Sequence, residues 1–329
     1  MKIHWTDPSK APLPGAPVAM QQHPRYGAAC IAWGRDAQWA AISHQGAPVG
    51  GALALIRQVV RLGGAALISR GPVWVPDATG RTEALKALRR DAPVTGLRAL
   101  FLTAEDTSQT APLSAAGLVQ VQTPMHVAEL DLTAPDLVRR AAQSVKWRNR
   151  LVVAEASGLR IRHTVLPPDP NHWLLRNEAA QQRAHGYRGL PPAFAAAWAS
   201  TAKDAAQLFV AHTGGDPLAA MLVLIHAPSA SYHIGWSGPE GRALNAHNLI
   251  LWRATTWLAA RGIARLDLGT VNTEDAPGLA RFKIGAGAAV RPLGGAWLGA
   301  PGTGALAAIQ SRRIAAKARH SAGRLPTLG

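Results

Sequence analysis

The alternation of apolar and polar residues along the chain predicts the same hairpin twice. Ile42–Arg57 (ISHQGAPVGGALALIR) and Val210–His226 (VAHTGGDPLAAMLVLIH) each have the pattern of a strand, a turn rich in glycine and proline, and a second strand. When the two are aligned, His44 meets His212 and Pro48 meets Pro217. The chain therefore contains an internal repeat.

The repeat continues beyond the hairpin. Ser69–Pro72 (SRGP) parallels Trp236–Pro239 (WSGP), and in both copies a helical segment and a short strand follow. This order predicts a mixed sheet flanked by helices, used twice. Between the copies, Ala134–Gly158 predicts one amphipathic helix with a glycine C-cap. We expect an N-terminal domain over residues 1–130, a C-terminal domain over 131–300 that carries the main site, and a basic tail over 301–329.

The composition is that of a folded protein with an excess of positive charge. The 329 residues are 48 % apolar and 16 % charged, which is typical of a globular chain rather than a disordered one. Lys and Arg number 35 against 19 Asp and Glu, which gives a net charge of +16. Such a surface attracts phosphates, nucleic acids or anionic lipids, although net charge also serves solubility alone.

Several classes of protein are disfavoured by the sequence. Cys30 is the only cysteine, so an internal disulfide and a multi-cysteine metal site are excluded, and we predict no metal and no resident cofactor. The first residues lack the apolar core of a signal peptide, which favours a cytoplasmic protein. No GxSxG, HExxH or GxxxxGK[ST] motif occurs, which disfavours a triad hydrolase, a zinc protease of that type and a P-loop kinase.

Several motifs resemble those of one known family. They include KWRNRLVVAEASG (Lys146–Gly158), SYHIGWS (Ser231–Ser237), LDLGTV (Leu266–Val271) and GLARFKIGAG (Gly278–Gly287). In order and spacing they resemble the FemAB-type peptidyltransferases. The resemblance implies an α/β (α+β) fold of two tandem GNAT-like domains. It also implies transfer of an amino acid from aminoacyl-tRNA to an amine on a peptidoglycan precursor.

The chain departs from that family at three points. Ala28 and Cys30 stand where the family places a basic residue in its first domain, and Thr103 beside Glu105 stands where it places a carboxylate. The helical coiled-coil arm of the larger members is absent. Relatives of the broad class use acyl-CoA or acyl carrier protein as donors, so the donor stays open.

Lys283 is the predicted catalytic residue. In the alignment Phe282 and Lys283 face Ala116 and Gly117, so this basic residue belongs to the second copy alone and is not required by the shared fold. A lysine in FKIGAG is suited to hold a phosphate or to stabilise a tetrahedral oxyanion. The alternative is a surface lysine at a helix end.

The predicted substrate-binding residues lie in four further segments. Arg188, in the loop HGYRGLPP, could grip a diphosphate or carboxylate, or be simply solvated. Alternation along SYHIGWS puts Tyr232 and Trp236 on one face of a strand and His233 on the other. Histidines 185, 233 and 247 are candidate bases, and none is assigned. The remaining binding residues are Asn245 and Asn248 at a helix start, of which Asn245 could be only an N-cap, and Phe282.

Two basic runs lack interspersed acids. One comprises Arg139, Arg140, Lys146, Arg148 and Arg150, and the other is the tail with Arg312, Arg313, Lys317, Arg319 and Arg324. They could contact RNA phosphates or the anionic inner face of a membrane, or they are solvated.

Three functions therefore stay open. The first is transfer of an aminoacyl or acyl group to an amine, on an acceptor that could itself carry phosphate. The second is CoA-dependent N-acylation, although the segment GWSGPEGRALNAHN lacks the pyrophosphate loop of such enzymes. The third is a non-catalytic RNA- or lipid-binding protein on the same fold.

Overall fold

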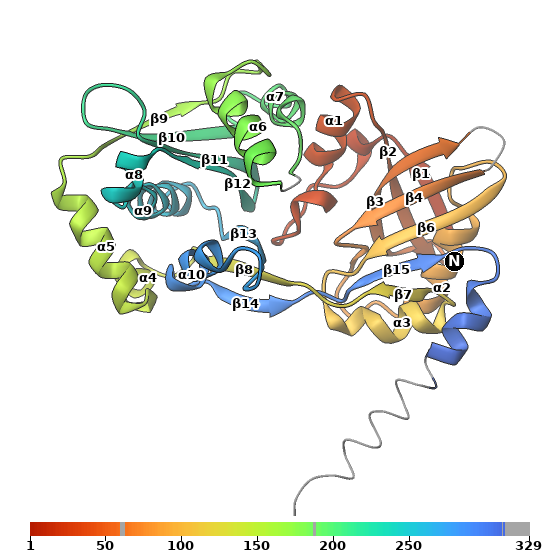
Figure 1. The fold of residues 1–329 in the computed structure, drawn as a ribbon. Helices are drawn as coiled ribbons and strands as arrows, with labels where there is room; N and C mark the ends of the chain where they lie inside the picture. Colours follow the sequence, from red (N-terminus) through yellow and green to blue (C-terminus); the bar gives the residue numbers. More distant parts are fainter. Residues whose placement is uncertain (60–62, 187–188, 311, 313–329) are drawn as a thin grey trace, which may run out of the picture. The chain divides into compact units, whose positions relative to one another are not determined.

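The computed structural model describes residues 1–59, 63–186, 189–310 and 312, and these form two compact units (Figure 1). Unit 1 consists of Met1–Ala11, Asp36–Met125 and the segment that starts at Pro292. Unit 2 consists of Pro12–Arg35 and His126–Arg291. The functional boundaries expected after residues 130 and 300 stay predictions.

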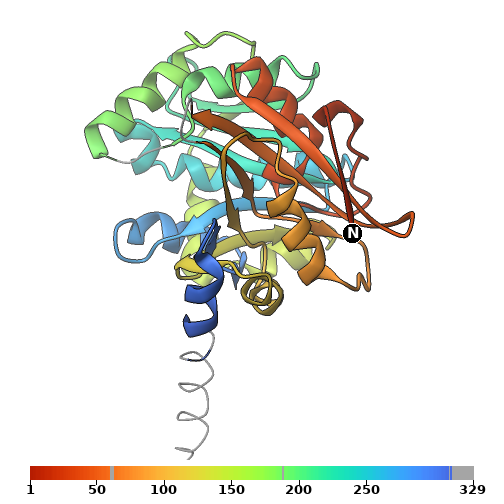
Figure 2. The ribbon, with the colours of Figure 1, turned by 90° about the vertical axis from the view of Figure 1, so that its right-hand side faces the viewer.

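Unit 1 is built on one mixed sheet. Its strand order is β1-β2-β3-β4-β6-β15-β7, and β5 pairs with β3. Two helices, α2 (Arg81–Arg90) and α3 (Thr110–Ala115), pack in this unit, and Figure 2 shows α2, in orange, from a second direction. The strands are β1 (Lys2–Thr6), β2 (Asp36–His44), β3 (Ala47–Val59), β4 (Gly63–Ser69), β5 (Val73–Trp74), β6 (Leu97–Thr103), β7 (Val119–Gln122) and β15 (Ala296–Gly299).

Unit 2 has the corresponding sheet, with strand order β9-β10-β11-β12-β13-β8-β14. Its strands are β8 (His126–Asp131), β9 (Arg160–Val165), β10 (Ala206–His212), β11 (Ala219–His226), β12 (Ser229–Ser237), β13 (Arg265–Val271) and β14 (Ala289–Pro292). Its helices are α1 (Pro24–Ala32), α4 (Asp136–Ala142), α5 (Val145–Ala156), α6 (Trp173–His185), α7 (Pro192–Ala199), α8 (Pro239–Ala243), α9 (Ala246–Ala259) and α10 (Pro277–Gly285). Short 3-10 helices span Pro8–Lys10, Met20–Gln22 and Thr107–Gln109.

Apart from β5, which has no counterpart in unit 2, the two sheets match strand for strand, and this confirms the predicted repeat. The hairpin β2–β3 corresponds to β10–β11, and both are antiparallel. One strand is exchanged in each sheet: β8, which follows unit 1 in the chain, lies between β13 and β14 of unit 2. In return β15, which follows unit 2, lies between β6 and β7 of unit 1. The two units therefore have equivalent sheets, although each sheet contains strands from both halves of the sequence.

Helices cover both faces of the sheet in unit 2, and the side chains of the hairpin explain why. Phe209, Met221 and Val223 share one face and form a buried cluster with residues of α9 and α5, including Leu249 and Leu151. Opposite them, α6 packs on β12 and α7 packs on β10. Because β10 and β11 are apolar at nearly every position, both of their faces can be buried.

The single helix predicted over Ala134–Gly158 is wrong, because the structure has two helices there. Gln143 and Ser144 have extended backbones, with ψ of 144° and 151°, and separate α4 from α5. The Ser144 amide donates to the carbonyl of Gly285 in α10 instead of continuing a helix, at 2.9 Å. The glycine C-cap is confirmed, since Gly158 has a φ of +75° just after α5. The break could not be predicted from the spacing of apolar residues, because α4 buries none of its residues and so has no buried face of its own to mark where it ends.

Candidate functional site

The two units differ where their parallel strands meet. In unit 1, β4 and β6 pair over seven residues, from Gly63 opposite Leu97 to Ser69 opposite Thr103. In unit 2, β12 and β13 pair only from Ser229 to Ser231. Beyond that point each strand still pairs with its other neighbour, β11 or β8. The second copy therefore has unpaired strand backbone in the middle of its sheet, where unit 1 is closed.

Lys283 lies beside the far end of β13. It is on α10, only 5 % exposed, and its Nζ donates a hydrogen bond of 2.8 Å to the carbonyl oxygen of Thr270. This is the only hydrogen bond of Nζ recorded within the described residues, although a lysine ammonium has three N–H donors. The surface-lysine alternative is therefore wrong: the side chain is buried and has donor capacity left for a ligand.

The charge of Lys283 is set by two opposing effects. Burial lowers the pKa of its ammonium from 10.5 to about 8, and the carboxylate of Asp267 limits the drop. Asp267 is itself buried and accepts a hydrogen bond of 2.6 Å from the amide of Gly269. At pH 7 the side chain of Lys283 is thus still protonated, but little free energy is needed to remove its proton. In these buried surroundings the ammonium would strongly stabilise a nearby anion.

Glycine at position 269 is favoured by the backbone conformation beside Lys283. Its φ is +77°, a left-handed conformation that glycine adopts without strain. A Cβ placed there would lie 3.7 Å from Nζ of Lys283. The sequence LDLGTV thus supplies the carboxylate of Asp267 and, two residues on, the left-handed backbone of Gly269.

Aromatic rings extend the site from α10 toward α9 and α5. Phe282 packs edge-on against His247 with ring centroids 6.2 Å apart, and it also contacts Trp147 at 6.0 Å. A Cβ on Gly235 would collide with the Tyr232 hydroxyl and approach Nε2 of His247 to 3.1 Å. Tyr232, His247 and Phe282 therefore gather on the face of the sheet that α9 covers.

The predicted alternation along SYHIGWS is wrong, because β12 contains a bulge. Ile234 pairs with Leu222 and Tyr232 pairs with Val223, so His233 is an extra residue opposite β11. Tyr232 consequently lies on the α9 face, and Trp236 lies on the opposite face. There Trp236 packs edge-on against Trp173 of α6, with centroids 5.6 Å apart.

The two asparagines stand at the start of α9. Asn245 is the N-cap residue, with φ of +54°, but its side chain makes no capping hydrogen bond. Asn248 is 5 % exposed and its Nδ2 has no hydrogen-bond partner within the described residues. This end of α9 therefore has backbone and side-chain donors left over.

The remaining sequence candidates are less informative. Burial lowers the pKa of both His233 and His247 to about 4, so both rings are neutral at pH 7. Arg188 lies outside the described residues, as do the side chain of His185 and the tail cations beyond Arg312. Glu105 in unit 1 forms an ion pair with Arg70 at 2.7 Å. Within the described residues, no group of three or more His, Cys, Asp or Glu side chains could hold a metal ion.

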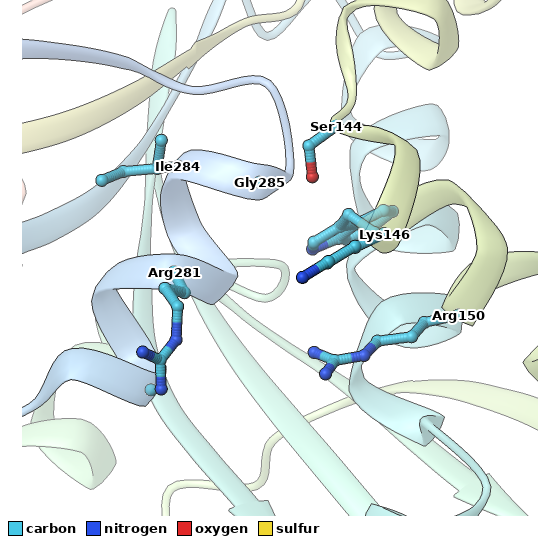
Figure 3. A pocket seen from close by; sticks show the side chains of 8 residues that line it. Ser144, Lys146, Arg150, Arg281, Ile284 and Gly285 are labelled. Carbon is cyan, nitrogen blue, oxygen red and sulfur yellow. The ribbon is translucent and has the colours of Figure 1, made fainter.

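A cavity of about 700 Å³ adjoins the other side of α10 and was not foreseen. It lies between α5 and α10, and Lys146, Arg150 and Arg281 reach into it (Figure 3). Lys146 and Arg150 belong to a basic run that the sequence shows. Arg281 is 131 positions further along the chain than Arg150, and only the fold brings it to them.

Comparison with known families identifies the part of the chain that carries this site. Residues 139–283 match the family model of an acetyltransferase (GNAT) domain. This segment is similar to a GNAT domain. It includes β12, α9, β13 and the FK pair, and the match confirms the prediction of an acyltransferase-type transferase. No curated protein sequence matches the chain.

Solved structures extend the GNAT likeness to both units. The crystal structure of FemX is 15 % identical, with 85 % of this chain and 92 % of that one covered and a TM-score of 0.67. A tandem GNAT protein from the clavulanic acid biosynthesis pathway is 12 % identical, with 92 % and 99 % covered and a TM-score of 0.53. The C-terminal domain of a putative lysylphosphatidylglycerol synthetase from Agrobacterium fabrum is 14 % identical, with 89 % and 92 % covered and a TM-score of 0.53. The chain thus has the fold of a FemAB-type tandem GNAT protein, as the sequence motifs predicted.

Proposed function

We propose that the protein transfers an aminoacyl or acyl group from a phosphate-bearing donor to an amine, with Lys283 as the catalytic cation. The observation that carries the proposal is the state of Lys283. Its side chain is buried, its Nζ is hydrogen-bonded only to the Thr270 carbonyl among the described residues, and it lies beside the unpaired strand ends of the GNAT-like segment. A buried cation with donors to spare stabilises negative charge far more than an exposed one does.

The reaction needs one bond to form and one to break. The amine nitrogen attacks the acyl carbon, and the carbonyl oxygen becomes an oxyanion that the Lys283 ammonium stabilises. Collapse of this intermediate breaks the bond from the acyl carbon to the donor's oxygen or sulfur. The amine loses a proton and the leaving group gains one. Both buried histidines have too low a pKa to be efficient bases at pH 7, so no residue is assigned to this proton.

The neighbouring residues are proposed to position the substrates. Phe282 and Tyr232 offer apolar surface on the α9 face, and Asn248 offers an unused amide donor. The resemblance to FemAB-type proteins supports aminoacyl-tRNA as donor and an amine of a peptidoglycan precursor as acceptor. Arg188, Asn245 and Trp236 stay predicted binding residues, and action in the cytoplasm with peripheral contact to an anionic membrane stays part of the proposal. No helix of the described residues is long and apolar enough to cross a membrane.

CoA-dependent N-acylation is the second candidate, because the matched family model is that of an acetyltransferase. The uncapped start of α9 has free N–H groups that suit an anionic group of a bound substrate. The two candidates differ in the donor and share the same Lys283 chemistry.

The test offers the purified chain three donors in parallel: charged tRNA, acetyl-CoA and acyl carrier protein bearing an acyl group. Mass spectrometry detects acyl transfer to a panel of amines, including a peptidoglycan precursor. Lys283→Met should lower kcat by on the order of a hundredfold, as loss of one oxyanion donor does. Because only protonated Lys283 stabilises the oxyanion, the rate should fall above pH 8. Wild-type kinetics in Lys283→Met would exclude the proposed role.

A further inference from the structure

The basic run on α4 and α5 does not act as one surface. Arg139 pairs with Asp136, and Arg140 forms an ion pair with Glu155 at 2.7 Å. Arg148 donates hydrogen bonds to the carbonyls of Ala141 and Gln143, at 2.8 and 3.2 Å, where α4 ends. Arg140 and Arg148 therefore hold α4 and α5 together, and Arg139 is engaged within α4.

Two cations of the run remain, and the fold supplies a third. Lys146, Arg150 and Arg281 are exposed, and none has an ion pair or hydrogen bond recorded within the described residues. Lys146 and Arg150 are one turn apart on α5, about 6 Å along the helix axis. Figure 3 shows both side chains reaching across the cavity toward Arg281 on α10.

The lining of the cavity defines the ligand by its charge. Of its eight lining residues three are cationic and none is acidic; the others are Ser144, Trp147, Gly278, Ile284 and Gly285. Trp147 is 3 % exposed and offers no open ring face on which a base could stack. The volume of about 700 Å³ is within the range of small-molecule sites. Three unpaired cations without an aromatic platform suit a chain of phosphates rather than a base or a sugar.

We propose that this cavity holds two or more phosphate groups of the acyl donor. The inference rests on the proposed function, in which the donor carries phosphate: charged tRNA and acyl-CoA have several phosphate groups, whereas acyl carrier protein has only one on its prosthetic group. Helix α10 connects the two places: Arg281 lines the cavity, and Lys283, two residues on and about 200° around the helix, lines the reaction site. The donor's phosphates would be anchored on one side of α10 while its acyl group reacts on the other.

The experiment measures binding without turnover, on the full chain. The probes are a short labelled single-stranded RNA, CoA and inorganic pyrophosphate, measured by fluorescence anisotropy or calorimetry at several salt concentrations. The test variant is Arg150→Gln with Arg281→Gln. The matched control is Arg160→Gln with Arg162→Gln, two exposed arginines of β9 in the same unit. Melting temperatures should be unchanged in both, since all four side chains are exposed.

We expect the test variant to lose at least about tenfold in affinity for the phosphate-bearing donor, and the control to lose little. If RNA is that donor, the slope of log K against log salt should also shrink by roughly 1.4, because two phosphate contacts are removed. Loss of RNA binding alone identifies an RNA-borne donor, and loss of CoA binding alone identifies CoA.

Equal losses in test variant and control, or no binding of any probe to the wild type, would overturn the proposal. Its failure is distinguishable from failure of the proposed function. Lys283→Met should lower kcat by on the order of a hundredfold and keep probe binding, whereas the cavity variant should weaken binding whether or not transfer is detected.

Discussion

Replacement of Lys283 by methionine should make the protein more stable while it removes activity. The side chain is buried, and burial lowers the pKa of its ammonium from 10.5 to about 8. At about 1.4 kcal/mol per pH unit, the folded state carries a cost of about 3 kcal/mol for holding this proton below pH 8. Methionine has a similar length and no charge, so it removes that cost.

Part of the gain is offset by the hydrogen bond from Nζ to the Thr270 carbonyl, which is lost at a cost of about 1 kcal/mol. The expected net gain is about 2 kcal/mol at pH 7. Between pH 8 and 10.5 the wild-type folded state has released the proton and the unfolded state still holds it, so wild-type stability rises with pH in that window. The advantage of Lys283→Met should therefore shrink and disappear by pH 10.5.

Urea unfolding followed by tryptophan fluorescence, at pH values from 7 to 10.5, measures this difference directly. Lys203→Met, which removes an exposed lysine from the same unit, is the matched control and should show no such pH dependence. A constant difference between wild type and Lys283→Met across the whole range would refute a buried ammonium at this position. The catalytic role would then lose its physical basis.

Three further outcomes test other parts of the structure. Gly269→Ala should destabilise the fold by about 1 to 2 kcal/mol in urea unfolding, because its φ is +77°; Gly215→Ala, in open space, should not. Glu129→Gln should lower the free energy of unfolding by about 2 kcal/mol, because Arg291 loses the charge of that carboxylate and one of its two 2.9 Å bonds; Glu240→Gln, an exposed residue of α8, is the control. Burial lowers the pKa of His233 to about 4 in the folded protein. As the pH falls from 6.5 to 4, this histidine is therefore protonated in the unfolded state before the folded state, and the free energy of unfolding drops. In urea unfolding, His233→Asn should lose less stability than the wild type over that pH range.

More of the fold than of the site could be predicted from the sequence. The repeated hairpin was predictable because strand alternation and turn residues are local signals, and both copies carry them. The exchange of β8 and β15 was not, since both strands are short and no local pattern in HVAELD or AWLG says which sheet each joins. The bulge at His233 was hidden for a similar reason: one extra strand residue leaves no mark in composition, yet it moves Tyr232 to the other face from Trp236.

Within the site, Lys283 could be singled out because only one copy of the repeat has a lysine there. Its burial and its neighbour Asp267 depend on packing that no local pattern reports. The cationic cavity shows the limit most clearly. The spacing of Lys146 and Arg150 places them on one helix face. Only the tertiary structure shows that other side chains and carbonyls bind Arg139, Arg140 and Arg148, and that Arg281 lies near Lys146 and Arg150.

The exchanged strands have a consequence for how the protein is made. The sheet of unit 1 needs β15, so it cannot be completed until residue 299 has left the ribosome, long after its other strands have been synthesised. Division of the gene after codon 130 would give two fragments, each lacking one strand of its own sheet and bearing one strand of the other. Neither fragment would fold into a complete domain alone. Co-expression of the two fragments should give folded protein, whereas separate expression should not.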